Sequence, residues 1–195
     1  MMRTTLTKFG FLTMVAVATS FVVTASLKAA DELKPDAREG VYKEDGKYFD
    51  KDDNPTWHYD IKKDERTGKE SQVWDWLTYN GNRRYHAECH VCHGPLGLGS
   101  SFAPALAESL KKMTYEQFRE VVVNGRTVPQ SDGSANVMPT FGENKNVMCY
   151  LDDFYVYLKA RADGVLGPVT IQQMKKERKN KEIKEEEYAC FGWDE

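Results

Sequence analysis

The sequence has no excess of basic charge, no internal repeat and, beyond residue 26, no long apolar run. Its 27 Lys and Arg stand against 30 Asp and Glu, a net charge of -3, which argues against nucleic acid as a partner because that ligand needs a basic surface. The charged fraction of 29% and the mean hydropathy of -0.63 favour a water-soluble protein over a membrane bundle. The length of 195 residues fits one ordinary domain with extensions.

The one long apolar stretch lies at the N-terminus. Residues 1–8 contain two basic residues and no acidic one, and residues 9–26 are almost wholly apolar or small. This pattern is typical of a secretory signal, which we place over residues 1–30. An uncleaved anchor is the alternative, because the apolar run borders on the length that spans a bilayer. In either case we expect the rest of the chain to lie in the periplasm. If the signal is cleaved, we expect no stable membrane insertion.

Cleavage after Ala30 would change the charge balance. It would remove three basic residues and no acidic one, leaving 24 against 30 and a net charge of -6. An acidic surface is compatible with electrostatic steering toward a partner that carries a basic patch.

The two segments that flank the centre of the chain are polar. Residues 31–72 alternate turn dipeptides with aromatic residues, which predicts short strands or a hairpin laid on a neighbouring surface; a disordered linker is the alternative. Residues 164–195 form a charged tail, read as a solvated helix, whose apolar tip at residues 188–193 is expected to dock.

Residues 73–163 show helical periodicity and predict a small, mainly α domain of three helices with long connecting loops. The second helix begins at Thr114, an N-cap with Gln117 three residues on, and ends at residues 124–125. The third spans about residues 146–161 and is closed by Gly164. The apolar stripe of the first helix comprises Trp74, Leu77, Gly81 and Tyr85.

Cys89, Cys92 and His93 form the pattern C-x-x-C-H, the attachment signature of covalent haem. Two thiols one helical turn apart suit the two vinyl groups on one edge of a porphyrin, and the histidine that follows can reach the iron. A zinc site would need a second pair of ligands at comparable spacing, and a thioredoxin-like site would need a βαβ pattern; the sequence has neither.

A sixth iron ligand must come from elsewhere in the chain. We predict Met138, in the loop after the second helix, because a thioether favours ferrous iron and suits an electron carrier. The alternatives are His58, His86 and His90, of which His90 lies inside the attachment segment and should point away from the iron. Simple packing of Met138 is a further alternative.

These residues resemble the class I cytochromes c over roughly residues 74–161. The resemblance implies that Gly81 and Tyr85 cross Phe154 and Tyr157 of the last helix, and that the Pro104 carbonyl accepts a hydrogen bond from His93. Its motifs are G-x-x-x-Y-x-x-x-C-x-x-C-H at residues 81–93, Ala103-Pro104-x-Leu106, Met138-Pro-x-Phe141 and Tyr157-Leu158-Lys159.

A narrower resemblance is to the methanol-metabolism-related c-type cytochromes, which also have four cysteines. It is carried by residues 83–94, 99–106 and 146–153. That family implies a periplasmic electron acceptor for a quinoprotein (PQQ) methanol or alcohol dehydrogenase, similar to cytochrome cL, that passes electrons to a cytochrome or a terminal oxidase.

Cys149 and Cys190 remain once the haem has taken its pair. An even remainder in an exported chain favours a disulfide that pins the tail to the haem domain. The alternative is a buried thiol at Cys149 with Cys190 pairing between molecules.

Three classes of function are compatible with these features. The leading one is a monohaem electron carrier that is not an enzyme. A haem enzyme of the peroxidase type would need an open iron, against which Met138 argues. A subunit that mainly anchors a complex is the third, supported by the two extensions.

Overall fold

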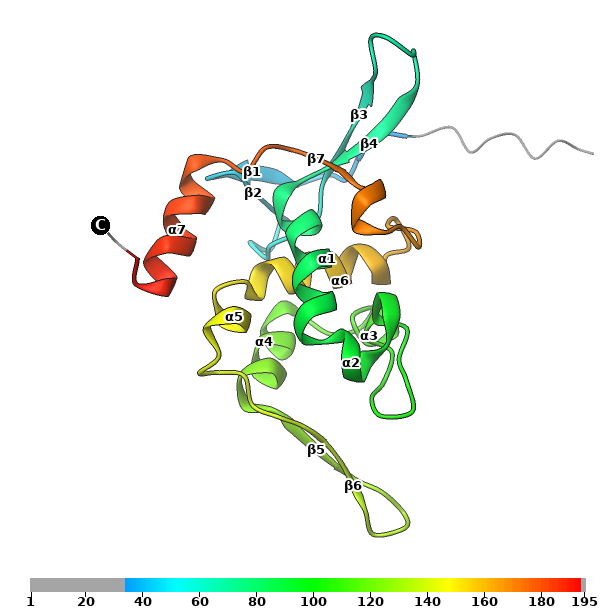
Figure 1. Ribbon diagram of the computed structural model, residues 1–195, viewed down its shortest axis with the longest axis vertical. Coiled ribbons are helices and arrows are strands. Elements are labelled where there is room, and N and C mark those ends of the chain that lie inside the picture. Colours follow the sequence, from blue (N-terminus) through cyan, green and yellow to red (C-terminus); the bar gives the residue numbers. More distant parts are fainter. Residues whose placement is uncertain (1–33, 194–195) are drawn as a thin grey trace, which may run out of the picture. The chain divides into compact units, whose positions relative to one another are not determined.

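The computed structural model describes residues 34–193, which belong to one compact unit (Figure 1). The predicted signal peptide over residues 1–30 lies outside the described residues. Within residues 34–193 no helix is both long enough and apolar enough to cross a membrane.

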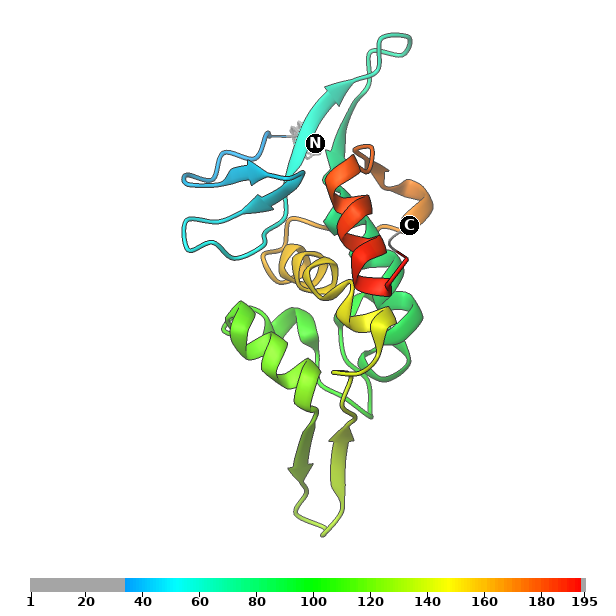
Figure 2. The ribbon, with the colours of Figure 1, turned by 90° about the vertical axis from the view of Figure 1, so that its left-hand side faces the viewer.

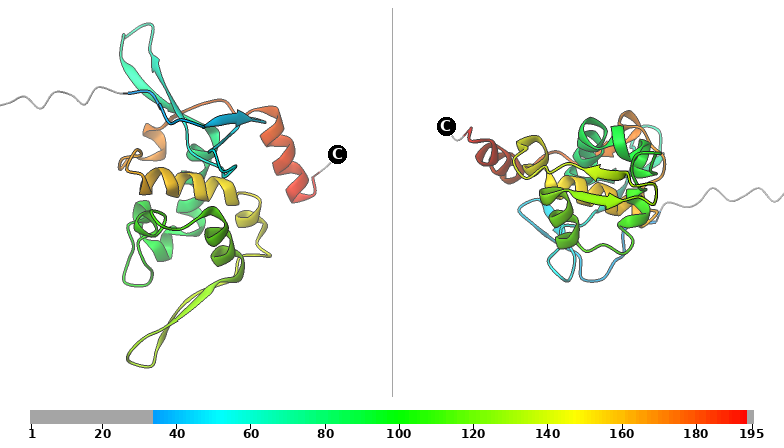
Figure 3. Two further views of the ribbon diagram at one scale, coloured as in Figure 1. Left: turned by 180° about the vertical axis from the view of Figure 1, so that it is seen from behind. Right: turned by 90° about the horizontal axis from the view of Figure 1, so that it is seen from below.

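Two crossing helices, α1 (Trp76–Glu88) and α6 (Leu151–Ala162), form the centre of the core (Figure 1 and Figure 3). Asp75 caps α1 because its side chain accepts a hydrogen bond from the Thr78 backbone N–H at 2.8 Å. Gly81 and Tyr85 face α6 as the resemblance implies: Tyr85 and Tyr157 have ring centroids 5.5 Å apart.

The remaining helices are mostly short. α4 (Tyr115–Asn124) begins at Thr114 with the predicted capping box, in which Gln117 takes part, and ends at Gly125. The others are α2 (His90–His93), the 3-10 turn η1 (Pro95–Gly97), α3 (Leu106–Ser109), α5 (Lys145–Met148), the 3-10 turn η2 (Ile171–Gln173) and α7 (Lys181–Phe191).

Three small sheets accompany the helices. The first is the antiparallel hairpin β1 (Tyr42–Glu44) and β2 (Lys47–Phe49). The second pairs β3 (Tyr59–Lys63) with β4 (Glu70–Trp74), and β4 in parallel with β7 (Lys175–Lys176). The third is the hairpin β5 (Arg126–Pro129) and β6 (Ala135–Met138). It extends from the helices at the end opposite to the other two sheets (Figure 2). The expected strands at residues 31–72 are therefore confirmed.

Two predicted helix limits are wrong. Val73 and Trp74 belong to strand β4, because they pair with both β3 and β7 before Asp75 starts the helix. The helix predicted over residues 146–161 is two helices, since Tyr150 has non-helical backbone angles (φ -132°, ψ 23°) between α5 and α6.

Both flanking segments contribute to the hydrophobic core. Trp57 is buried, and its indole N–H donates to the Asp163 carboxylate at 2.8 Å, which ties the N-terminal strands to the end of α6. Ile183 of α7 is buried in the same cluster. Further core residues from the C-terminal segment are Leu166 and Met174.

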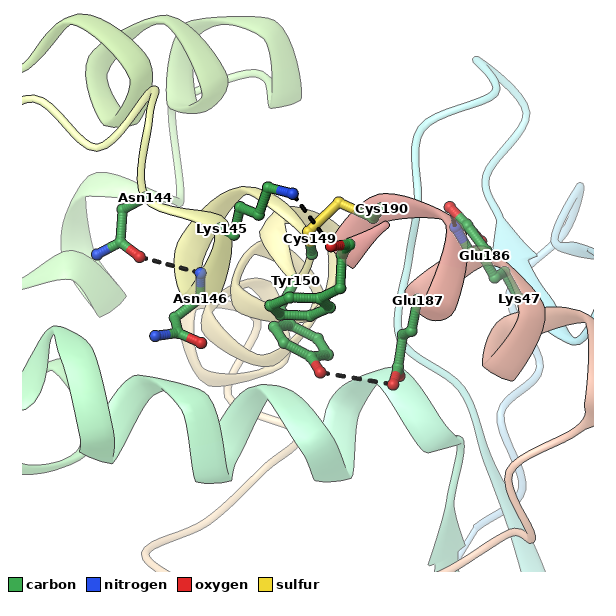
Figure 4. The surroundings of a disulfide bond; sticks show 10 residues. Lys47, Asn144, Lys145, Asn146, Cys149, Tyr150, Glu186, Glu187 and Cys190 are labelled. Atoms are coloured by element: carbon green, nitrogen blue, oxygen red, sulfur yellow. Dashed lines mark hydrogen bonds and ion pairs between the residues drawn. A yellow bond between two sulfur atoms is a disulfide. The ribbon is translucent and has the colours of Figure 1, made fainter. Parts of the chain in front are cut away.

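The predicted disulfide between Cys149 and Cys190 is confirmed, with Cα atoms 5.7 Å apart. Figure 4 shows that it joins the C-terminal end of α5 to the last turn of α7. Beside it the Phe191 carbonyl accepts a hydrogen bond from Lys145 Nζ at 3.1 Å, and the Phe191 ring lies 5.8 Å from that of Tyr150. The tip of the tail is thus docked, as expected from its apolar residues.

Candidate haem site

The C-x-x-C-H segment begins where α1 ends. Cys89 is the C-cap of α1, and its backbone N–H still bonds to the Tyr85 carbonyl at 2.9 Å. The Cys89 carbonyl then accepts hydrogen bonds from the backbone N–H groups of Cys92 at 3.2 Å and His93 at 3.0 Å. This single helical turn fixes the two thiols and the imidazole relative to one another.

The imidazole of His93 is held from the opposite side by the loop before α3. His93 is 7% exposed, and its Nδ1 lies 2.9 Å from the Pro104 carbonyl, as the resemblance implies. A carbonyl oxygen only accepts, so Nδ1 carries the proton and Nε2 keeps its lone pair. A backbone carbonyl that orients an imidazole in this way is typical of histidines that ligate metals.

Two glycines shape the loop between His93 and Pro104. Gly94 has a φ of +71°, and a Cβ there would lie 2.1 Å from the Gly99 carbonyl oxygen. Gly99 in turn donates its backbone N–H to the His93 carbonyl at 2.8 Å. Any larger residue at position 94 would therefore push the loop away from His93.

Two side chains beyond the predicted site residues also hold this loop. The buried Tyr85 hydroxyl donates to the Gly94 carbonyl at 2.5 Å. Arg161, near the end of α6, donates through Nε to the Leu96 carbonyl at 3.3 Å. The apolar stripe of the first helix identifies Tyr85 as a core residue, but no local pattern reveals a polar contact between a helix and a loop 65 residues away.

The two motif cysteines are not joined in a disulfide. Cys89 is half-buried and Cys92 is exposed. Burial, followed by the nearby charges of Glu88 and Cys92, raises the pKa of the Cys89 thiol to about 12. Among residues 34–193 no group of three or more His, Cys, Asp or Glu side chains is arranged to hold a metal ion.

Met138 is the last residue of strand β6, paired with Arg126, whereas the sequence predicts a loop at this position. Strand β6 includes Met138 because four residue pairs align between β5 and β6, and Met138 belongs to one of them. Met138 is half-buried and packs against the core cluster, whereas the rest of β6 is exposed. In two views the hairpin leaves the helical body at the end where α2 lies (Figure 1 and Figure 2).

The three histidines that are alternative ligands each have other neighbours. His58 is bonded through Nδ1 to Asp36 at 3.0 Å, next to the N-terminal strands. His86 and His90 have ring centroids 5.4 Å apart, so the His90 ring is directed toward His86. The structure thus groups Cys89, Cys92, His93 and Pro104 and places Met138 on a separate element.

This donor set fits a covalently attached haem. Two thiols and an imidazole with a free Nε2 follow one another on one helical turn, which is the arrangement that c-type attachment requires. The Nδ1 bond to Pro104 sets the orientation of the ligating ring.

Comparisons with known proteins agree with this site. No protein-family model matches the chain. Cytochrome c-553I of Paracoccus denitrificans is 41% identical over 167 residues, which make up 85% of this chain and 66% of that protein. Cytochrome c-555 of Methylococcus capsulatus is 43% identical over 93 residues, or 47% of this chain and 68% of that protein.

A solved structure is also similar. The c-type cytochrome XoxG from Methylobacterium extorquens AM1 superposes with a TM-score of 0.64 at 49% identity, covering 76% of this chain and 84% of that chain. Fold and site therefore define a c-type haem protein. The chain belongs to the c-type cytochromes, as the class I resemblance indicates, and its cofactor is covalently attached haem c with its iron.

Proposed function

We propose that the protein is a periplasmic monohaem cytochrome that carries one electron at a time and is not an enzyme. The observation that carries this proposal is the fixed tautomer of His93, whose Nδ1 bonds to Pro104 while Nε2 is left for iron at the end of the C-x-x-C turn. Family membership supports it, because the similar proteins are named as cytochromes.

In this proposal Cys89 and Cys92 would form the thioether bonds, and His93 and Met138 would ligate the iron. The haem supplies the redox chemistry, and the protein supplies ligation, burial and docking. A thioether ligand from Met138 would favour ferrous iron and would leave no open site for a peroxidase reaction. Tyr85, Arg161 and Pro104 act as positioning residues that keep the attachment loop in place.

The partners follow from the narrower sequence resemblance. We infer that the donor is a quinoprotein (PQQ) methanol or alcohol dehydrogenase and that the acceptor is another cytochrome or a terminal oxidase. Export through the signal at residues 1–30 would place the protein in the periplasm with such a donor. The resemblance at residues 83–94, 99–106 and 146–153 supports this assignment.

Covalent attachment is tested by acid-acetone extraction of the exported holoprotein. The colour is expected to stay with the polypeptide, whereas release of free haem would refute attachment through Cys89 and Cys92. The double variant C89S/C92S should lose covalent haem. The variant C149S/C190S, which removes the other two cysteines, is the matched control and should retain it.

A further inference from the structure

Two histidines beside the haem-attachment turn are left over by the proposed function. His86 lies in the last turn of α1 and His90 opens α2, four residues later. Their ring centroids are 5.4 Å apart, with 42° between the ring planes. Neither ring is fully buried, because His86 is exposed and His90 is half-exposed. The buried His93 has its own partner in Pro104 and does not belong to this pair.

The hydrogen bonding of His86 prepares it for a metal ion. Its Nδ1 lies 2.8 Å from the Asn82 carbonyl, which only accepts, so Nδ1 is protonated and Nε2 carries the lone pair. A backbone carbonyl on the second nitrogen is the support that ligating histidines commonly have. Among the described residues, no hydrogen bond is formed by His86 Nε2 or by the His90 ring, so both remain available.

We propose that His86 and His90 form a binding site for a divalent transition-metal ion of the Zn²⁺, Cu²⁺ or Ni²⁺ type. The two histidines lie on either side of Cys89, where α1 ends and α2 begins, and their rings are 5.4 Å apart; histidines at positions i and i+4 of a helix bind one metal ion at the same sequence spacing. Imidazole suits these ions, whereas Mg²⁺ and Ca²⁺ require oxygen ligands. Because no third His, Cys, Asp or Glu completes a cluster within residues 34–193, water fills the remaining coordination positions.

The site is distinct from the haem iron, whose proposed ligand His93 is three residues farther along. It would place a dication on the surface of an acidic protein, next to the segment that carries the cofactor. A metal site at this pair would give a role to His90, the histidine inside the C-x-x-C motif. Haem attachment itself does not require a histidine at that position.

Calorimetric titration of the holo cytochrome with ZnCl₂ tests the site. The expected result is one Zn²⁺ bound per chain, and no binding of MgCl₂. Loss of even an outer partner of a metal ligand commonly weakens affinity about 10–100-fold, so H86Q and H90Q are each expected to weaken Zn²⁺ binding at least that much. H58Q removes a histidine that is bonded to Asp36 and is the matched control, with affinity unchanged.

Absence of Zn²⁺ binding to the wild type, or equal affinity in H86Q and H90Q to that of the wild type, would overturn the proposal. Electron paramagnetic resonance with Cu²⁺ is a second measurement that does not depend on the variants. Coupling of the copper signal to two imidazole nitrogens is expected, and a spectrum with oxygen ligands alone would contradict the site. The haem absorption spectrum of each variant verifies that the fold and the cofactor are intact.

Discussion

Gly81 of α1 lies directly against the backbone of Asp153 in α6. A Cβ added at Gly81 would be 2.0 Å from the Asp153 carbonyl oxygen and 2.6 Å from Tyr157 Cβ. Both neighbours are buried residues of α6, packed in the core. The crossing of the two central helices, and with it the position of Cys89 at the end of α1, depends on the absence of a side chain here.

The variant G81A should therefore separate α1 from α6. Overpacking in a well-packed core typically costs about 1–3 kcal/mol, and we expect the upper end of that range because backbone atoms are involved. Denaturant unfolding of the holoprotein measures the loss. A Cβ added at Gly167 would meet no atom within 4 Å, and the φ of Gly167 lies outside the left-handed region, so G167A should change stability by less than about 0.5 kcal/mol. Equal effects of the two variants would contradict this account of the crossing.

The disulfide between Cys149 and Cys190 closes a loop with a sequence separation of 41 residues. For a loop of this length the constraint on the unfolded chain is worth about 4 kcal/mol. Unfolding of C149S/C190S should show a loss of that order, with the haem spectrum retained. Mass spectrometry of a non-reduced digest provides the direct check, since two alkylatable thiols in the native protein would rule the bond out.

Stability should also depend on the ionisation of Asp153, which is 7% exposed and accepts a hydrogen bond from Asn80 Nδ2 at 3.2 Å. Burial first, with lesser effects of Asp152 and Glu187, raises the pKa of Asp153 well above its ordinary value of 3.8, against the opposing effects of Asn80 and Lys47. The folded state thus binds this proton more tightly than the unfolded chain. Protonated Asp153 therefore contributes to the free energy of unfolding. This contribution is complete at pH values below the pKa of the unfolded state and is lost as pH rises through the pKa of the folded state.

The variant D153N keeps the shape of the side chain and removes its charge. As pH rises above the ordinary value of 3.8, the unfolding free energy of the wild type should fall relative to that of D153N, and the fall should end once pH exceeds the raised pKa of the folded state. Unfolding curves for both proteins across this pH range give the difference directly. A difference that does not change with pH would mean that the pKa of Asp153 is the same in the folded and the unfolded protein.

Met138 is the proposed sixth ligand, on a strand whose other residues are exposed. Ferric wild-type protein should show a sulfur-to-iron charge-transfer band, and M138A should lose it and have a lower potential, because the thioether favours ferrous iron. Reduced M138A should also bind carbon monoxide, which the wild type should exclude. M148A alters a half-buried methionine of α5 and should keep the band. Retention of the band in M138A would show that another group ligates the iron.

The elements of the fold that could be predicted from the sequence are those determined by residues close together in the chain. The capping box at Thr114 and the end of α4 at Gly125 depend on residues three to four positions apart. The C-x-x-C-H turn is likewise complete within five residues, which is why its geometry could be anticipated.

The features that escaped prediction depend on distant partners. Val73 and Trp74 are strand residues because they pair with β3 on one side and, on the other, with Lys175 and Lys176 from about a hundred positions away. The contact of Arg161 with the Leu96 carbonyl and the Trp57 bond to Asp163 also join distant segments. Such contacts leave no periodic pattern in the sequence, so the particular partners of these side chains could not be predicted.

If electrostatic steering brings the acidic carrier to its donor, the rate of reduction should fall as salt is added. The screening length is about 8 Å at physiological ionic strength and shorter above it. Stopped-flow measurements over a range of NaCl concentrations give this dependence. A rate of reduction that does not depend on salt concentration would contradict electrostatic steering but would not contradict electron transfer.

Electron transfer itself is tested most directly by rapid mixing of the oxidised holo cytochrome with a quinoprotein alcohol dehydrogenase and its alcohol, while the haem absorbance is followed. We expect reduction of the haem by one electron per chain, dependent on both enzyme and alcohol, and reoxidation by an acceptor cytochrome or oxidase. A haem that stays ferric with every such dehydrogenase, although a chemical reductant reduces it, would contradict the proposed function.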